Sequence, residues 1–111
     1  MGLLTAGTVV LVRFPFSDLS RTKLRPAVVV ADAGRGDWVL CQITSKPYGD
    51  PSAISIGDSD FASGSLSVAS FVRPGKLFTA SEELVLSAVG ILKREGFEKI
   101  VESIILLLRR G

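Results

Sequence analysis

Two short segments of this sequence place a cation and hydroxyl groups where strands are expected to meet loops. Arg25 precedes an apolar run (PAVVVA), in which Pro26 restricts the backbone and removes one hydrogen-bond donor. Thr44 and Ser45 follow another apolar run (WVLCQI). A guanidinium held at a rigid strand end suits an anionic ligand, because its planar set of N–H donors matches two oxygens of a carboxylate or phosphate.

A glycine-rich turn between these segments predicts an antiparallel hairpin. The turn, DAGRGD, spans 32–37, and folding the chain about Arg35 sets Arg25 beside Thr44 to within a residue or two. The pair would then share one end of the hairpin with Ser45. This set suits a phosphodiester: the guanidinium stabilises charge on phosphoryl oxygens, while the hydroxyls donate to those oxygens or orient an attacking 2′-hydroxyl. Because a guanidinium is a poor proton donor, such catalysis rests on positioning and electrostatics.

Less specific interpretations of the same residues stay open. Arg25 could form a structural ion pair with Asp18 or Asp32, and spacing alone favours that alternative. Thr44 taken alone is more often an ordinary strand residue. Asp18 is also the carboxylate considered as a base for the 2′-hydroxyl.

The composition bounds the fold and excludes several kinds of catalysis. The chain has 111 residues, of which 47% are hydrophobic, as expected for one domain, 1–111, with a small core. It contains no histidine and one cysteine. Histidine-based acid–base catalysis, Ser-His-Asp and Cys-His systems, and zinc sites of these ligands are therefore excluded. Cys41 is interpreted as a small buried hydrophobe, with a reactive thiol as the alternative.

Basic residues are concentrated in the first 30 positions. Arg13, Arg21, Lys23 and Arg25 face a single acid there, Asp18, although the whole chain carries only +2. Such a patch fits a phosphate-bearing partner, but by charge alone a solvated strand face is the better explanation. Since no apolar run is long enough to span a bilayer and no signal-peptide pattern is visible, we expect a cytoplasmic protein without membrane contact.

Apolar patterning predicts a mainly β fold with a helix at the C-terminus. Strands are expected at 8–14, 25–31, 38–44, 53–56, 66–72 and 76–79, with a break at Pro74 and Gly75. Periodicity leaves 84–92 open between strand and helix. The segment 97–108 follows the apolar stripe of an amphipathic helix. Many short strands followed by one helix indicate a small curled sheet or barrel.

The predicted C-terminal helix is more apolar than one sheet requires. Leu106 and Leu107 widen its stripe beyond the residues needed for packing on a single sheet. They either pack more deeply or contact a second copy of the chain, and the sequence favours neither alternative.

Four sequence elements together resemble the MazF/PemK toxins of type II toxin–antitoxin systems. They are GTVVLVRFPFS at 7–17, RPAVVV at 25–30, QITSK at 42–46 and the C-terminal helix. The arginine-proline strand start and the I-T-S element are the specific part of a match that covers nearly the whole chain. The resemblance implies a small SH3-like or CcdB/PemK-type β-barrel with a C-terminal α-helix, an α+β fold that is mainly β. It also implies a strand within 84–92.

The resemblance further implies a homodimeric, metal-independent endoribonuclease (mRNA interferase) that needs no cofactor. Such toxins cut single-stranded RNA at short sequences and leave 2′,3′-cyclic phosphate and 5′-hydroxyl ends. A cognate antitoxin neutralises them by laying a segment over the RNA groove. By position, Arg25 and Thr44 match the family's catalytic arginine and threonine, and Ser20 matches its RNA-contacting loop serine. The alternative is a non-catalytic barrel, such as a CcdB-like gyrase inhibitor or an RNA-binding relative.

Further RNA contacts are expected from polar, basic and aromatic side chains. The candidates are Ser20, Arg21, Lys23, Ser45, Tyr48, Arg73 and Lys76, with Tyr48 as the aromatic residue expected nearest to RNA. The chain departs from the family in two places: Arg21 and Thr22 replace acidic and amide residues, and Ser70 stands near a common aspartate. Arg73 and Lys76 are expected to supply phosphate contacts instead, or are ordinary surface cations.

Overall fold

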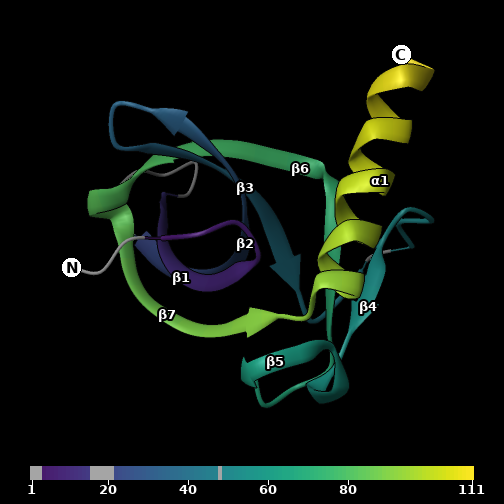
Figure 1. Cartoon of the computed structure of the whole chain (residues 1–111), viewed down its shortest axis with the longest axis horizontal. Coiled ribbons are helices and arrows are strands. Elements are labelled where there is room, and N and C mark those ends of the chain that lie inside the picture. Colours follow the sequence, from purple (N-terminus) through teal and green to yellow (C-terminus); the bar gives the residue numbers. More distant parts are fainter. Residues whose placement is uncertain (1–3, 16–21, 48) are drawn as a thin grey trace.

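One curled β-sheet and one α-helix make up the fold. The computed structural model describes residues 4–15, 22–47 and 49–111. In these residues seven antiparallel strands, in the order β4-β6-β3-β2-β1-β7-β5, curl into a half-barrel with the helix beside it (Figure 1). The elements are β1 (Thr8–Pro15), β2 (Thr22–Gly34), β3 (Asp37–Thr44), β4 (Ile54–Ile56), β5 (Phe61–Gly64), β6 (Ser70–Ser81), β7 (Val85–Leu92) and α1 (Arg94–Arg110). The predicted fold class, a mainly β barrel-like sheet with a C-terminal helix, is confirmed.

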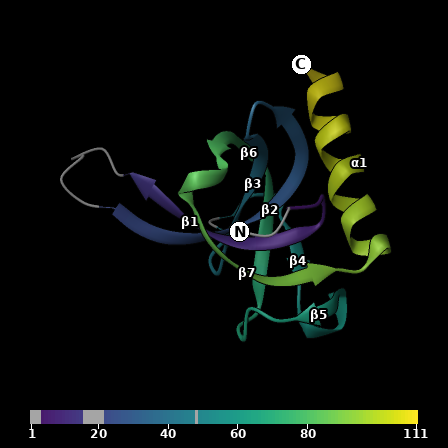
Figure 2. The ribbon, with the colours of Figure 1, turned by 60° about the vertical axis from the view of Figure 1, so that its left-hand side comes forward.

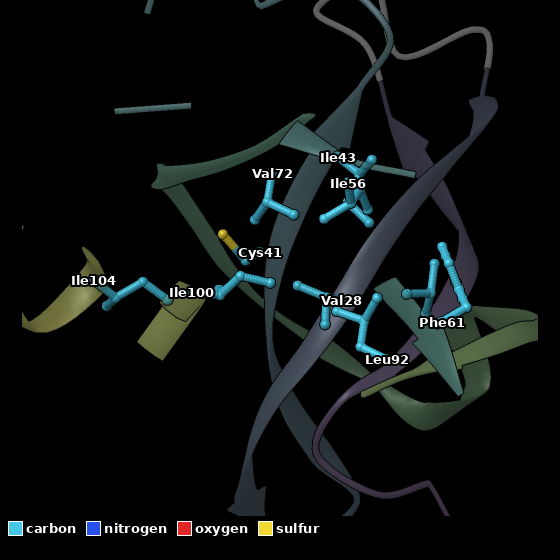
Figure 3. Close-up of a cluster of buried hydrophobic side chains, with 10 residues drawn as sticks. Val28, Cys41, Ile43, Ile56, Phe61, Val72, Leu92, Ile100 and Ile104 are labelled. Carbon is cyan, nitrogen blue, oxygen red and sulfur yellow. The ribbon is translucent and has the colours of Figure 1, made fainter. Parts of the chain in front are cut away.

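Hydrophobic side chains fill both faces of the curled sheet. The helix-side cluster (Figure 3) consists of Val9, Val28, Cys41, Ile43, Ile56, Phe61, Val72, Leu92, Ile100 and Ile104. The opposite-face cluster consists of Leu4, Val10, Val12, Ala27, Val29, Leu40, Ala80 and Val85. Successive residues of β2 alternate between the two cores, because side chains of a strand point to opposite faces in turn. β2, anchored on both faces, is a stiff support for the residues at its N-terminal end.

The β2–β3 hairpin has the predicted position and register. Its turn has positive φ at three successive residues, 34–36, with values between 58° and 88°. Two of the three are glycines, which adopt this region without the clash that a Cβ brings. Beyond the turn Ala27 pairs with Gln42. Two residues further along the strands, the same register brings Arg25 opposite Thr44.

The structure corrects the predicted strands in the middle of the chain. The strand expected at 66–72 begins only at Ser70, and the break expected at Pro74 lies inside β6. Pro74 is tolerated because residues 73–76 bulge out of the ladder between β6 and β3, so its missing N–H costs no ladder bond. The patterns do not predict β5, since only the first of its four residues is buried and no alternation marks it.

The C-terminal part of the chain settles the alternative between strand and helix that the sequence leaves open for 84–92. The segment 84–92 contains β7, which pairs with β1 on one side and β5 on the other. α1 follows the predicted stripe and buries Ile100 and Ile104 (Figure 3). Of the two leucines that widen its stripe, Leu107 is half-buried, whereas Leu106 is 61% exposed and is not explained by deeper packing. Contact of Leu106 with a second copy of the chain stays a prediction. The helices found in the described residues are too short or too polar to cross a bilayer.

Both overall views agree on where the edge strands lie. α1 lies at one side of the curled sheet, and β4 and β5 lie near the N-terminal end of this helix (Figures 1 and 2). Ile56 of β4 and Phe61 of β5 belong to the helix-side cluster together with Ile100. The two edges of the sheet are thus tied to the core by side chains rather than by further strand pairing.

Candidate functional site

A groove opens where β2 begins and β3 ends. It has a volume of about 470 Å³. Its described lining combines basic residues, hydroxyl residues and apolar residues, namely Lys23, Leu24, Arg25, Pro26, Ile43, Thr44, Ser45, Lys46, Leu66, Val68 and Ser70. The segments 23–26, 43–46 and 66–70 come together here although they are far apart in the sequence. The hairpin and the entry to β6 therefore build this groove jointly.

Arg25 and Thr44 line the groove together, as the hairpin register requires. Arg25 pairs with Val12 of β1, and it is half-buried. Thr44, the last residue of β3, is only 8% exposed. Both strands are held by the two cores, so neither residue depends on a loop for its position. A guanidinium and a fixed hydroxyl thus belong to the same groove at one end of the hairpin.

The hydroxyl of Thr44 already has two partners. Its Oγ1 donates to the carbonyl oxygen of Lys46 and accepts from the backbone N–H of Lys46, both at 3.1 Å. A hydroxyl offers one donor and two acceptor lone pairs. With its donor committed to Lys46, Thr44 has acceptor capacity left for a ligand. The geometry therefore favours an orienting role over donation to a phosphoryl oxygen.

The groove is electropositive. Lys23, Arg25 and Lys46 lie in its described lining, and that lining contains no carboxylate. Asp32, one of the two acids considered as an ion-pair partner of Arg25, lies seven residues further along β2, which is roughly 23 Å of extended strand at about 3.3 Å per residue. Its Oδ1 accepts from the N–H of Gly34 at 2.8 Å. The other acid, Asp18, is outside the described residues.

Arg73 and Lys76 lie on β6 and do not belong to the described lining of this groove. Arg73 Nε donates to Asp50 Oδ2 at 3.0 Å, and the two side chains are only 21% and 16% exposed. This hydrogen bond, together with one from the N–H of Ser52, holds the pKa of the Asp50 carboxyl below its ordinary 3.8. Arg73 thus ties Asp50 and its neighbours to β6, and the RNA contacts expected of Arg73 and Lys76 both stay predictions.

Of the remaining residues expected to contact RNA, some line the groove and others lie outside the described part of the chain. Lys23 and Ser45 are exposed and line the groove beside Arg25 and Thr44. Three of the expected RNA contacts, Ser20, Arg21 and Tyr48, lie outside the described residues.

Several residues that line the groove are not predicted from the sequence as site residues. Lys46 lies within the QITSK element, but the sequence does not predict it as an RNA contact. Leu66 and Val68 fall within the strand expected at 66–72, and Leu24 is given no role, because apolar patterning does not distinguish a buried side chain from one that faces a groove. Val68 is in fact 62% exposed.

Cys41 lies in the hydrophobic core and outside the described lining of the groove. Cys41 is buried in the helix-side cluster, its thiol donates to the carbonyl oxygen of Arg73 at 3.1 Å, and burial raises its pKa to about 12. The prediction of a small buried hydrophobe is confirmed. Within 4–15, 22–47 and 49–111, no group of three or more His, Cys, Asp or Glu side chains could hold a metal ion.

A larger hollow lies elsewhere. It has a volume of about 810 Å³ and is lined by Gly7 and the first turns of α1, including Phe97. The charged side chains that line it include Arg94 and Glu98, which pair with each other at 3.2 Å. Size alone would favour this hollow, but its described lining carries two carboxylates, Glu98 and Glu102, against one cation. The smaller groove is the better candidate for an anionic ligand.

Comparison with known proteins supports this fold. A MazE–MazF complex from Deinococcus radiodurans matches with a TM-score of 0.77 at 18% identity, over 100% of both chains. An endoribonuclease in complex with its cognate antitoxin from a Mycobacterial species matches with a TM-score of 0.72 at 18% identity, over 98% of this chain and 96% of that one. The Mycobacterium tuberculosis toxin MazF-mt6 matches with a TM-score of 0.71 at 16% identity, over 92% and 96%.

These structural similarities establish the fold at low identity, and no curated protein matches the sequence. The sequence itself fits the family model of the PemK-like, MazF-like toxins over residues 5–108, which is nearly its whole length. The chain therefore belongs to the PemK-like, MazF-like toxin family of type II toxin–antitoxin systems.

Proposed function

We propose that this protein is a sequence-selective endoribonuclease toxin that cleaves single-stranded mRNA at the Arg25–Thr44 groove. The observation that carries the proposal is the shared position of Arg25 and Thr44 in a groove whose described lining is cationic and lacks carboxylates. Membership of the toxin family supports it. So does the likeness of the fold to an endoribonuclease bound to its antitoxin.

The proposed reaction is an internal transesterification. The 2′-oxygen bonds to the adjacent phosphorus, and the bond from phosphorus to the 5′-oxygen breaks. The proton lost by the 2′-hydroxyl balances the proton gained by the departing 5′-oxygen. The products are a 2′,3′-cyclic phosphate and a 5′-hydroxyl, and the reaction consumes neither water nor a cofactor.

Each groove residue has a role in this reaction that follows from its chemistry. Arg25 holds the scissile phosphate with its fork of N–H donors and stabilises the charge that grows on the phosphoryl oxygens. Thr44 accepts a hydrogen bond from the 2′-hydroxyl and orients it for in-line attack, since its own proton is committed to Lys46. Lys23 and Lys46 bind neighbouring phosphates and steer RNA into the groove.

The proposal includes the partners that its relatives imply. The protein acts in the cytoplasm as a homodimer, and a cognate antitoxin silences it by covering the RNA groove. The exposed Leu106 and Leu108 on α1 are apolar surface available for such contacts. The motivation is that two of the matched structures are toxin–antitoxin complexes.

Purified protein incubated with single-stranded RNA in EDTA tests the activity. Cleavage that leaves cyclic phosphate and 5′-hydroxyl ends is the expected result. Intact RNA together with stalled DNA gyrase would instead support the CcdB-like alternative. Dependence of cleavage on an added divalent cation would contradict the metal-independent reaction.

A further inference from the structure

Apolar side chains, two of them exposed to solvent, line the groove together with its cations. Val68 is 62% exposed and Leu24 is 44% exposed, and Leu66, which also lines the groove, is half-buried and packs against the helix-side cluster. We call these three residues the apolar wall. Exposed apolar surface at a charged groove indicates a ligand with an apolar part. A phosphate alone would need no such surface.

The backbone that carries the wall is held in an uncommon conformation. Ser67, between Leu66 and Val68, has a φ of 69°, which non-glycine residues rarely adopt. Its N–H donates to Ser65 Oγ at 2.9 Å, and Ser65 Oγ donates to Asp58 Oδ1 at 2.6 Å. Backbone outliers that are braced in this way gather at ligand sites, because the surrounding structure must stabilise them.

The far end of the same segment is braced as well. Ser70 is only 3% exposed, lines the groove and donates its hydroxyl proton to the carbonyl oxygen of Val68 at 3.1 Å. With the donor used, the Ser70 hydroxyl has acceptor lone pairs left for a ligand N–H. The segment therefore presents an apolar surface and one fixed acceptor to the groove.

We infer that the apolar wall and Ser70 form a nucleobase subsite, which seats the base next to the phosphate held by Arg25 and sets the cleavage preference at that nucleotide. This inference rests on the proposed function. A nucleotide joins an anionic phosphate to a flat, largely apolar base, and the groove offers a matching surface for each part. Leucine and valine pack against the face of the base, and Ser70 accepts from an amino or imino N–H on its edge.

Substitutions at Leu24 and Val68, the two exposed residues of the wall, test the subsite without threatening the cores. Leu24→Ser and Val68→Ser are compared with Leu86→Ser, a 49% exposed leucine on β7 outside the groove lining. Each protein cleaves a pool of single-stranded RNA with randomised sequence, and sequencing of the 5′ ends gives the preference at each position. Thermal melting checks that every variant is folded.

The wall variants are expected to lower kcat/KM on the preferred sequence about tenfold and to relax the preference at one nucleotide beside the cut. Leu86→Ser should cleave like the wild type. Wall variants that keep both the wild-type preference and rate would overturn the subsite while leaving the nuclease intact, and an equal loss in Leu86→Ser would also overturn it. A wild-type protein that cleaves no RNA would overturn the proposed function and the subsite with it.

A pair of backbone variants gives an independent readout. Ser67→Gly retains easy access to positive φ and should keep the wild-type preference. Ser67→Val is strained at that φ and should relax the preference at the same nucleotide as Val68→Ser. Equal preferences in the two variants would contradict a role for the braced backbone.

Discussion

Two arginines on nearby strands of this sheet are held in contrasting surroundings. Arg73 on β6 lies against Asp50 at 3.0 Å, with both side chains mostly buried. Arg25 on β2 lines a groove whose described lining has hydroxyls and two further cations but no carboxylate. An arginine matched by an internal acid is a structural tie. An arginine in a cationic groove is suited to an anion from outside, and the sequence alone does not separate the two cases.

Removal of Arg25 should have the largest effect on activity. Arg25→Ala is expected to lower the cleavage rate at saturating RNA by about 10²–10³-fold, the usual loss for one electrostatic stabiliser of a transition state. The cleavage rate of Arg25→Lys should lie between those of this variant and the wild type, because lysine keeps the charge but lacks the planar set of N–H donors of a guanidinium.

Arg109→Ala is the matched control, since it removes the same charge from the exposed end of α1. It should cleave within about twofold of the wild type. An Arg25→Ala protein as active as this control would remove Arg25 from the catalytic site.

Substitution of Thr44 should have the next largest effect on cleavage. Thr44→Val deletes the hydroxyl but keeps the shape, and we expect about a 10–100-fold lower cleavage rate, the range for loss of an orienting contact. Thr44→Ser keeps the hydroxyl and should recover most of the rate. Equal rates for the two variants in single-turnover assays would show that the hydroxyl has no part in the reaction.

Arg73 should matter for stability rather than for cleavage. Arg73→Ala is expected to lower the free energy of unfolding by about 1–2 kcal/mol, because it leaves the Asp50 carboxylate without its charge-assisted hydrogen bond. Urea unfolding measures this loss, and cleavage at a temperature well below melting should change less than about threefold. A large loss of cleavage with unchanged stability would reverse the assignment of the two arginines.

The pH dependence of stability isolates the same ion pair with a smaller effect. Since the pKa of Asp50 is lowered below 3.8 in the folded protein, unfolding in acid takes up a proton. Its contribution is therefore present above the ordinary pKa and is lost as the pH falls below about 4 through the lowered value. Asp50→Asn should be less stable than the wild type at pH 6, and this difference should shrink by pH 3. A difference that stays constant across this range would show that the carboxylate charge is not what stabilises the loop.

The sequence predicts this fold well where local patterns and core packing agree. The β2–β3 hairpin follows from the DAGRGD turn and its flanking apolar runs, and its register alone brings Arg25 opposite Thr44. The pattern is wrong at Pro74, because a bulge against β3 removes the need for a proline N–H, and the bulge depends on a partner strand distant in sequence.

Prediction of the site fails for a similar reason. Asp50 is the partner of Arg73 across 23 residues, and no local signal joins them. Val68 falls within the strand expected at 66–72 and Leu24 precedes the strand expected from Arg25, so the sequence gives neither a role at the site, and only the three-dimensional arrangement shows that they line the groove.

Cleavage by Arg25→Ala and Arg73→Ala, side by side on one single-stranded RNA in EDTA, tests the central claim most directly. The account predicts that Arg73→Ala yields cyclic phosphate and 5′-hydroxyl ends at nearly the wild-type rate, while Arg25→Ala, equally well folded, leaves the RNA intact over the same time. Cleavage by Arg25→Ala at the wild-type rate would contradict the assignment of the groove as the nuclease site.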